Sequence, residues 1–236
     1  MRSLMWFRND LRMDDNPALR GACKSSDEVH AIYIYSKNQN QKHNEANCKT
    51  EFFIENLKFL EIELSKLNIP LTILNSEGFE DNAEIIYDYV ENHSLHKVFF
   101  NNQFGFDEIK RDGSVKNYLK SKNIEFENFD EQVVFAPGSI LTAEGKPYSV
   151  FTPFKRRWIE NFDMDCLDIE FKYTVKKESN IKSNVKNIIF EKDHSVDMSL
   201  WPAGEKTALL KLKDYLDNKV IRYAKDRNDP ILEGTS

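Results

Sequence analysis

Hydrophobic and polar positions in the first half of the chain alternate between short apolar runs and longer helical stripes. The short runs, rich in β-branched and aromatic residues, predict five strands at residues 4–7, 28–35, 70–75, 97–100 and 124–129. The stretches between them predict helices at about 17–23, 51–67, 81–92 and 106–119. This alternation predicts an α/β fold, with a five-stranded, mostly parallel, doubly wound sheet and helices on both of its faces.

The clearest helical signal is an apolar stripe in residues 51–67. Its members recur at spacings of four, three, four and three residues, which is the period of an amphipathic helix. They are Phe53, Leu57, Leu60, Leu64 and Leu67. The segment before this stripe, residues 36–48, is rich in Asn, Gln and Lys and predicts a polar loop.

The turn after the first strand is unusually charged. Two arginines and three aspartates occupy residues 8–15, and Asn16 with Pro17 then predicts the N-cap and first turn of a helix. A charged turn at the carboxyl end of a strand is where an open α/β sheet places its functional crevice. The alternative is a self-paired structural turn that closes the sheet, and the spacing alone favours neither.

The pattern changes near residue 132. Pro-Gly turn signals and an aromatic, basic segment at 150–158 lead into a Lys- and Asn-rich stretch at 173–197, which predicts a long solvated connector. Residues 205–223 then predict a helix with one apolar face. We therefore expect an α/β domain at 1–131, a connector at 132–201 and the first helix of another domain at 202–236. That apolar face has no partner domain in the 236 residues.

Composition narrows the class of protein. The chain has 236 residues, 40% of them hydrophobic, and no apolar run near the length of about 20 residues that a membrane span needs. We expect a soluble, cytoplasmic protein. A net charge of −6 argues against wholesale coating of nucleic acid but leaves room for a local basic groove.

Several common sites are excluded. The three cysteines, Cys23, Cys48 and Cys166, lie far apart without the spacing of a zinc site, and we expect reduced thiols and no metal. Neither GxGxxG nor a P-loop is present, so the sheet is not of the usual dinucleotide-binding or P-loop kind.

Several motifs together resemble the photolyase/cryptochrome family, in particular its folate-type bacterial pyrimidine-dimer photolyases. They occur in the family's order and at its spacing over the whole chain. They are WFRNDLR at 6–12, DNPAL at 15–19, VFTPFK at 150–155, Glu205 with Lys206, and EGTS at 233–236. The resemblance implies an antenna domain, a connector, and a helical domain that binds FAD and UV-damaged DNA. Only the start of that last domain would be present, with the catalytic residues beyond Ser236.

The resemblance also implies a site for an antenna methenyltetrahydrofolate. The family uses a His after the second strand and an Asn-Glu pair after the fourth, and the matching positions hold His43, Asp107 and Glu108. The Glu108 carboxylate suits the amino and ring N–H groups of a pterin. Asp107 differs from the family's Asn: it lacks the amide donor and adds a negative charge.

Four C-terminal residues match family contacts to FAD and DNA. Tyr223, Thr235 and Ser236 match groups that touch the FAD phosphates, and Arg227 matches an arginine near the DNA backbone. Because the catalytic part is expected elsewhere, the chain alone would retain no FAD and repair no DNA. We also expect a monomer.

Two other functions remain open: a cryptochrome-type photoreceptor, and a stand-alone α/β binding module left by truncation. The resemblance supplies no ligand contact for the first turn, so we expect Arg8, Asp10 and Arg12 to tie the first strand to the connector at 151–154. Residues 155–157 are basic and are expected to dock the connector on the helical domain.

Overall fold

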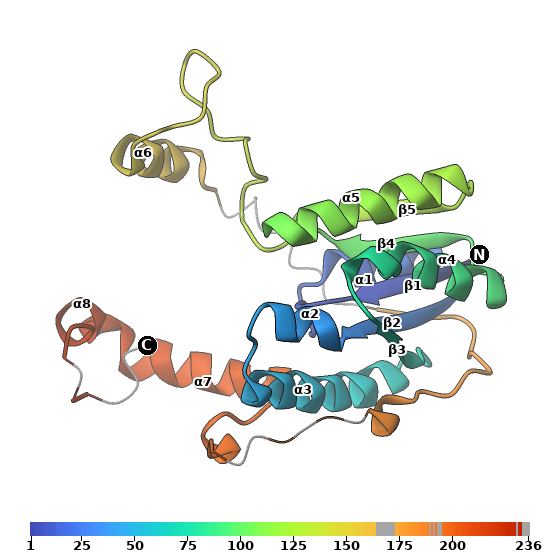
Figure 1. Ribbon diagram of the computed structural model, residues 1–236. Coiled ribbons are helices and arrows are strands. Elements are labelled where there is room, and N and C mark those ends of the chain that lie inside the picture. The colour runs from blue at the N-terminus through green and yellow to red at the C-terminus, as the bar shows by residue number, and fades with distance from the viewer. Residues whose placement is uncertain (164–172, 189, 191, 193–194, 230, 233–236) are drawn as a thin grey trace.

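A five-stranded parallel sheet forms the centre of the molecule (Figure 1). The computed structural model describes residues 1–163, 173–188, 190, 192, 195–229 and 231–232. The strand order is β3-β2-β1-β4-β5, and every neighbouring pair is parallel. The strands are β1 (Arg2–Phe7), β2 (Glu28–Ser36), β3 (Leu71–Ser76), β4 (Lys97–Asn101) and β5 (Glu125–Phe129). The predicted α/β class and strand count are confirmed, and the sheet is wholly parallel.

Helices cover both faces of this sheet, as the alternation of β1 side chains requires. Met5 and Phe7 point into one core with α1 and α3, whereas Leu4 and Trp6 point into a second core with α4 and α5. These helices are α1 (Pro17–Ser25), α3 (Asn47–Ser65), α4 (Asn82–Asn92) and α5 (Phe106–Ser121).

The start of α1 follows the sequence prediction. The Asn16 side chain accepts a hydrogen bond from the Leu19 N–H at 3.1 Å, and Pro17 occupies the first helical position. The predicted start of the next helix, residue 51, is about one turn too late: α3 begins at Asn47. Its stripe is buried at Leu57, Leu60 and Leu64, while Phe53 is half-buried.

The predicted loop at 36–48 is wrong in part, because it contains the short helix α2 (Lys37–Lys42). This helix is made of Lys, Asn and Gln, so it has no apolar period by which the sequence could reveal it.

The charged turn after β1 is a structural latch, but its partners differ from the expected ones. The Asp10 carboxylate accepts hydrogen bonds from the Arg8 backbone N–H (2.7 Å) and the Asn101 amide (2.6 Å). The Arg8 guanidinium pairs with Asp112 of α5 at 3.1 Å. Arg12 contacts Glu131 at 2.5 Å. The expected tie to residues 151–154 is therefore wrong: these three side chains join the end of β1 to Asn101 at the end of β4, to α5 and to Glu131 after β5.

The connector is not solvated throughout, which corrects a second expectation. Asn184 lies against the edge strand β3, where its side-chain oxygen accepts from Ile73 N–H (2.6 Å) and its amide donates to Ile73 C=O (3.1 Å). Val185, at the start of the short 3-10 turn Val185–Asn187, is 1% exposed in the first core. The polar composition of this segment gave no sign of this packing. The Asn184 side chain forms the hydrogen bonds that a neighbouring strand would otherwise make to the edge strand β3.

Three helices project from the sheet on one side (Figure 1). They are α6 (Phe151–Asn161), α7 (Glu205–Asn218) and α8 (Tyr223–Asp226). The predicted apolar face of α7 is exposed at Leu209, Leu212 and Leu216. Within the described ranges, no helix has the length and apolarity to cross a membrane. The domain limits at 131 and 201 stay a prediction.

The short 3-10 segments complete the described structure. Besides Val185–Asn187, they are η1 (Phe79–Asp81), η4 (Met198–Leu200) and η5 (Val220–Arg222). Cys166, expected to be a reduced thiol, lies outside the described residues, and Cys23 and Cys48 are free thiols.

Arg8 and Arg12 offer a matched pair of substitutions that tests the latch. Replacing Arg8 with Ala breaks a nearly fully buried ion pair, and we expect a loss of about 3–5 kcal/mol in unfolding free energy. Replacing Arg12 with Ala removes a partly exposed pair and should cost about 1 kcal/mol or less. Urea denaturation measures both values. An Arg8→Ala midpoint equal to that of the unaltered chain would contradict the latch.

Asn184 tests the edge-strand role of the connector. Replacing it with Ala leaves the Ile73 N–H and C=O without their partner, and we expect a loss of about 1–3 kcal/mol with faster hydrogen exchange at the Ile73 amide. Asn180→Ala, at an exposed position of the same connector, is the control. Unchanged exchange at Ile73 in the Asn184→Ala chain would show that the contact does not protect the edge.

Candidate functional site

A cavity lies at the carboxyl ends of β1, β2 and β4. The chain runs from β1 outward to β3 on one side and from β4 to β5 on the other, so the strand order reverses between β1 and β4. Open α/β sheets bind ligands at such a point. The cavity walls include Arg8 after β1, Tyr35 at the end of β2 and Gln103 after β4, with the start of α3 closing one side.

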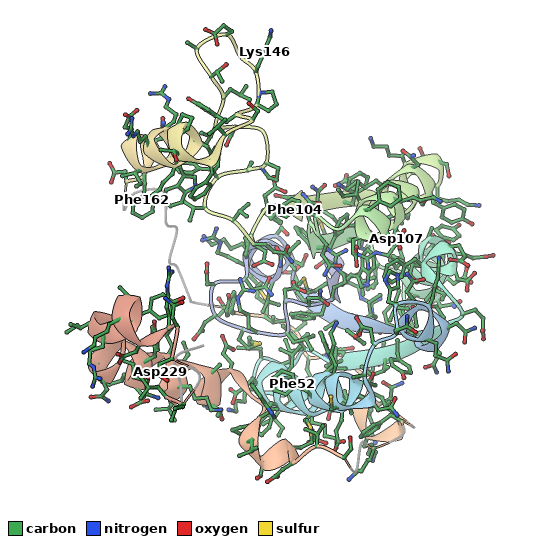
Figure 2. All side chains as sticks on the ribbon, turned by 60° about the vertical axis from the view of Figure 1, so that its left-hand side comes forward. Phe52, Phe104, Asp107, Lys146, Phe162 and Asp229 are labelled. Atoms are coloured by element: carbon green, nitrogen blue, oxygen red, sulfur yellow. The ribbon has the colours of Figure 1, made fainter. Side chains whose placement is uncertain are left out.

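Two of the three residues expected to hold an antenna ligand, His43 and Glu108, line this cavity, and the third, Asp107, contacts His43. His43 caps the C-terminus of α2, and Asp107 and Glu108 lie in the first turn of α5. His43 Nε2 lies 3.2 Å from Asp107 Oδ2, and both His43 and Glu108 line the cavity. Asp107 is labelled in Figure 2, on the first turn of α5. Residues 43 and 107 are 64 positions apart in the sequence, yet they lie together and form a polar edge of the cavity.

This polar edge is open to solvent on one side and held by a buried group on the other. The side chains of His43 and Asp107 are 44% and 35% exposed, so a ligand can reach them. Gln39, buried in α2, places its amide nitrogen 2.6 Å from His43 Nε2 and fixes the imidazole. Both carboxylates lie in the first turn of α5, at the positive end of its helix dipole.

The inner wall of the cavity carries two buried arginines. Arg8 and Arg111 are each 5% exposed and share one oxygen of Asp112, at 3.1 Å and 2.8 Å. Arg111 also donates to Gln103 at 2.7 Å. Burial lowers the pKa of Arg8 to about 10, because the desolvation of the cation outweighs the attraction of Asp112.

A tyrosine completes the wall on the β2 side. Burial raises the pKa of the Tyr33 hydroxyl far above its usual value, so this group stays a neutral phenol. The cavity thus offers carboxylates and an imidazole at its edge, and guanidinium groups and a neutral phenol farther along its wall. Such a wall suits a flat polar ligand that carries both donors and acceptors.

The sequence did not single out Arg111 and Asp112. They lie on the buried face of α5 with Val115 and Leu119, at positions where an amphipathic helix normally carries apolar residues. A charged pair that interrupts an apolar stripe was the signal that could have found them.

The C-terminal candidates are not brought to this cavity. Tyr223 begins α8 and Arg227 follows it, both exposed and at the far end of α7. Figure 2 shows Asp229 in this projecting part of the chain and Phe162 in the other. Thr235 and Ser236 lie outside the described residues. Where the structure describes the chain, no group of three or more potential ligand side chains suits a metal ion.

Comparison with known proteins finds relatives that are named deoxyribodipyrimidine photo-lyase. Its sequence is 32% identical over 234 residues to the deoxyribodipyrimidine photo-lyase of Escherichia coli, covering 99% of the chain and 49% of that protein. It is 31% identical over 238 residues to the enzyme of the same name from Vibrio cholerae, covering 99% of the chain and 50% of that protein. The chain thus spans about half the length of these curated relatives.

Solved structures give the same result. A class III photolyase from Agrobacterium tumefaciens superposes with a TM-score of 0.79 at 26% identity, over 96% of this chain and 47% of that one. A cryptochrome from Synechocystis has the same fold, with a TM-score of 0.67 at 18% identity over 97% of this chain and 49% of that one. The model of the DNA photolyase family matches residues 3–173, which is more than half of the sequence. With a five-stranded parallel sheet that these structures share, the chain belongs to the DNA photolyase family.

Proposed function

We propose that this chain is the antenna part of a light-dependent DNA repair enzyme, and that its cavity edge binds a folate chromophore through His43, Asp107 and Glu108. The observation that carries the proposal is that His43 from the end of α2 and Glu108 from α5 line one cavity, with Asp107 in contact with His43. Bound methenyltetrahydrofolate would supply absorption of near-ultraviolet light and transfer of that excitation to a reduced flavin.

The chemistry of the edge fits a pterin ring. A carboxylate at Glu108 accepts paired hydrogen bonds from an amino group and a ring N–H, which fixes the orientation of a flat ligand. Asp107 replaces the amide that folate-type relatives carry, and its Oδ2 lies 3.2 Å from His43 Nε2. This contact keeps the two side chains together at the edge of the proposed site.

The repair chemistry of the whole enzyme is proposed from the family. Reduced FAD, held outside the antenna cavity, would supply the light-driven electron that splits a flipped-out pyrimidine dimer. Within this chain we propose that Tyr223, Thr235 and Ser236 contribute to an FAD site and Arg227 to a DNA contact. The exposed apolar face of α7 supports packing against a further helical part.

Glu108 provides the first test of the folate site. Glu108→Gln keeps the shape of the side chain but loses the charged acceptor, and we expect folate affinity to fall about tenfold to a hundredfold, the equivalent of about 1.5–3 kcal/mol. Titration with methenyltetrahydrofolate, followed by near-ultraviolet absorption and fluorescence, measures the change. Glu125→Gln, at the opposite end of the sheet, is the matched control. Equal affinities in the two variants would remove Glu108 from the site.

Substitution of Asp107 is expected to change folate affinity in the opposite direction. Asp107→Asn restores an amide donor, and we expect folate affinity to rise by about tenfold, a hydrogen bond's contribution. Because His43 and Asp107 are partly exposed, the unfolding free energy should change by less than about 1 kcal/mol. The same titration, with urea denaturation beside it, checks both parts. Weaker binding in the Asn variant would mean that the charge of Asp107 serves the ligand.

A repair assay tests whether the 236-residue chain repairs DNA by itself. We expect the isolated 236-residue chain, loaded with folate, to leave pyrimidine dimers in DNA intact under blue light, because the proposed electron donor is not held by the cavity. A dimer-specific repair assay decides this. Loss of dimers in the light, but not in the dark, would contradict the assignment of repair to another part of the enzyme.

A further inference from the structure

Two guanidinium groups lie over one buried indole ring. Arg8 Cζ is 4.2 Å and Arg111 Cζ is 5.0 Å from the ring centroid of Trp6, whose exposed fraction is 1%. A single cation over an aromatic face is common, since it is attracted to the negative face of the ring. A second buried cation on the same ring is unusual, because the two cations repel each other.

The two cations over Trp6 share one carboxylate oxygen. Arg8 and Arg111 both pair with Oδ1 of Asp112. The carboxylates of Asp10 and Glu131 also attract the Arg8 charge. The Asp10 carboxylate is engaged by the Arg8 backbone N–H and by Asn101. Arg8 Nε and Nη2 are buried and have no acceptor among the described residues. Such a cluster is costly for stability, so its presence calls for another reason.

The indole N–H adds a second constraint. Trp6 Nε1 is buried, and the described part of the chain provides no acceptor for its proton. An indole that loses an electron becomes a radical cation and is more easily oxidised when it can pass its N–H proton to a neighbour. At Trp6 the positive charge of the radical would stay on the ring, beside two guanidinium groups.

The position of the arginines connects this environment with the cavity. Arg8 and Arg111 are part of the cavity wall, and Trp6 contacts them from the second core. A light-absorbing ligand in the cavity would therefore be separated from Trp6 by the side chains of Arg8 and Arg111. Electron transfer from this indole to an excited chromophore would leave an indole radical cation and a chromophore reduced by one electron, and the excitation would be lost when the electron returned.

We propose that Arg8 and Arg111 insulate Trp6 electronically, by making its one-electron oxidation unfavourable beside an excited chromophore. The proposal rests on the proposed antenna function and assigns to the arginine pair a role in preserving excitation. Arg111 is the better target, because Arg8 keeps Asp112 as a partner when Arg111 is replaced.

The first experiment needs no chromophore. In a chain where Trp158 and Trp201 are replaced by Phe, Trp6 is the remaining one of three tryptophans. Azide radicals generated by pulse radiolysis oxidise Trp and Tyr, and the ratio of the two radicals at equilibrium reports how easily Trp6 is oxidised. We expect Arg111→Met to raise the share of the Trp radical about tenfold, since one cation near the ring is removed.

Lys116→Met is the matched control. It removes one positive charge from the same helix, but Lys116 lies over Phe100 with its Nζ 5.6 Å from that centroid. The control should leave the ratio of radicals unchanged. Equal ratios in the Arg111→Met and Lys116→Met chains would overturn the proposal. If Arg111→Met does not give a cooperative thermal melt, Arg111→Gln, which retains polar contacts, is measured in its place.

The second experiment uses methenyltetrahydrofolate and separates this proposal from the antenna function. We expect its fluorescence lifetime to shorten in Arg111→Met and to recover when Trp6→Phe is added, because the electron donor is then gone. A shortened lifetime that Trp6→Phe does not restore would overturn the insulating role. A chain that binds no folate contradicts the proposed function, while the radical ratio still decides the role of the arginines.

Discussion

The buried carboxylate of Asp10 is the interaction on which the rest of this structure depends. It lies 5% exposed at the point where the strand order reverses, and it accepts hydrogen bonds from the backbone after β1 and from Asn101 at the end of β4. Neighbouring parallel strands diverge at such a point, because their following helices lie on opposite faces of the sheet. Asp10 holds the two strand ends together while leaving room for a cavity beside them.

The same turn positions the cavity wall. With its backbone N–H bound to Asp10, Arg8 extends to Asp112 of α5, and this pair fixes the helix whose first turn carries Asp107 and Glu108. His43 reaches that turn from the other side, from α2. A structural latch at the base and an adaptable polar edge at the surface are thus parts of one network. This arrangement places rigid groups under a site that stays accessible.

The sequence predicted those parts of the fold that depend on apolar periodicity. Leu57, Leu60 and Leu64 identified α3, and the β-branched run after Glu28 identified β2, because burial of such side chains requires a regular spacing. Helix α2 escaped prediction, since its six residues are polar and tertiary contacts decide their conformation. Asn184 escaped as well, because its role at β3 depends on where the chain returns, which local sequence does not encode.

The site shows the same division. Family motifs in the sequence led to His43, Asp107 and Glu108, and the fold brings them together, but the buried partners Arg111 and Asp112 emerged from the structure. The direct test of the central claim is a nuclear magnetic resonance titration of the isotopically labelled chain with methenyltetrahydrofolate. The account predicts shifts of the His43 imidazole and of the Asp107 and Glu108 amides, with the Glu125 amide unmoved. Shifts confined to α8, or none at all, would contradict it.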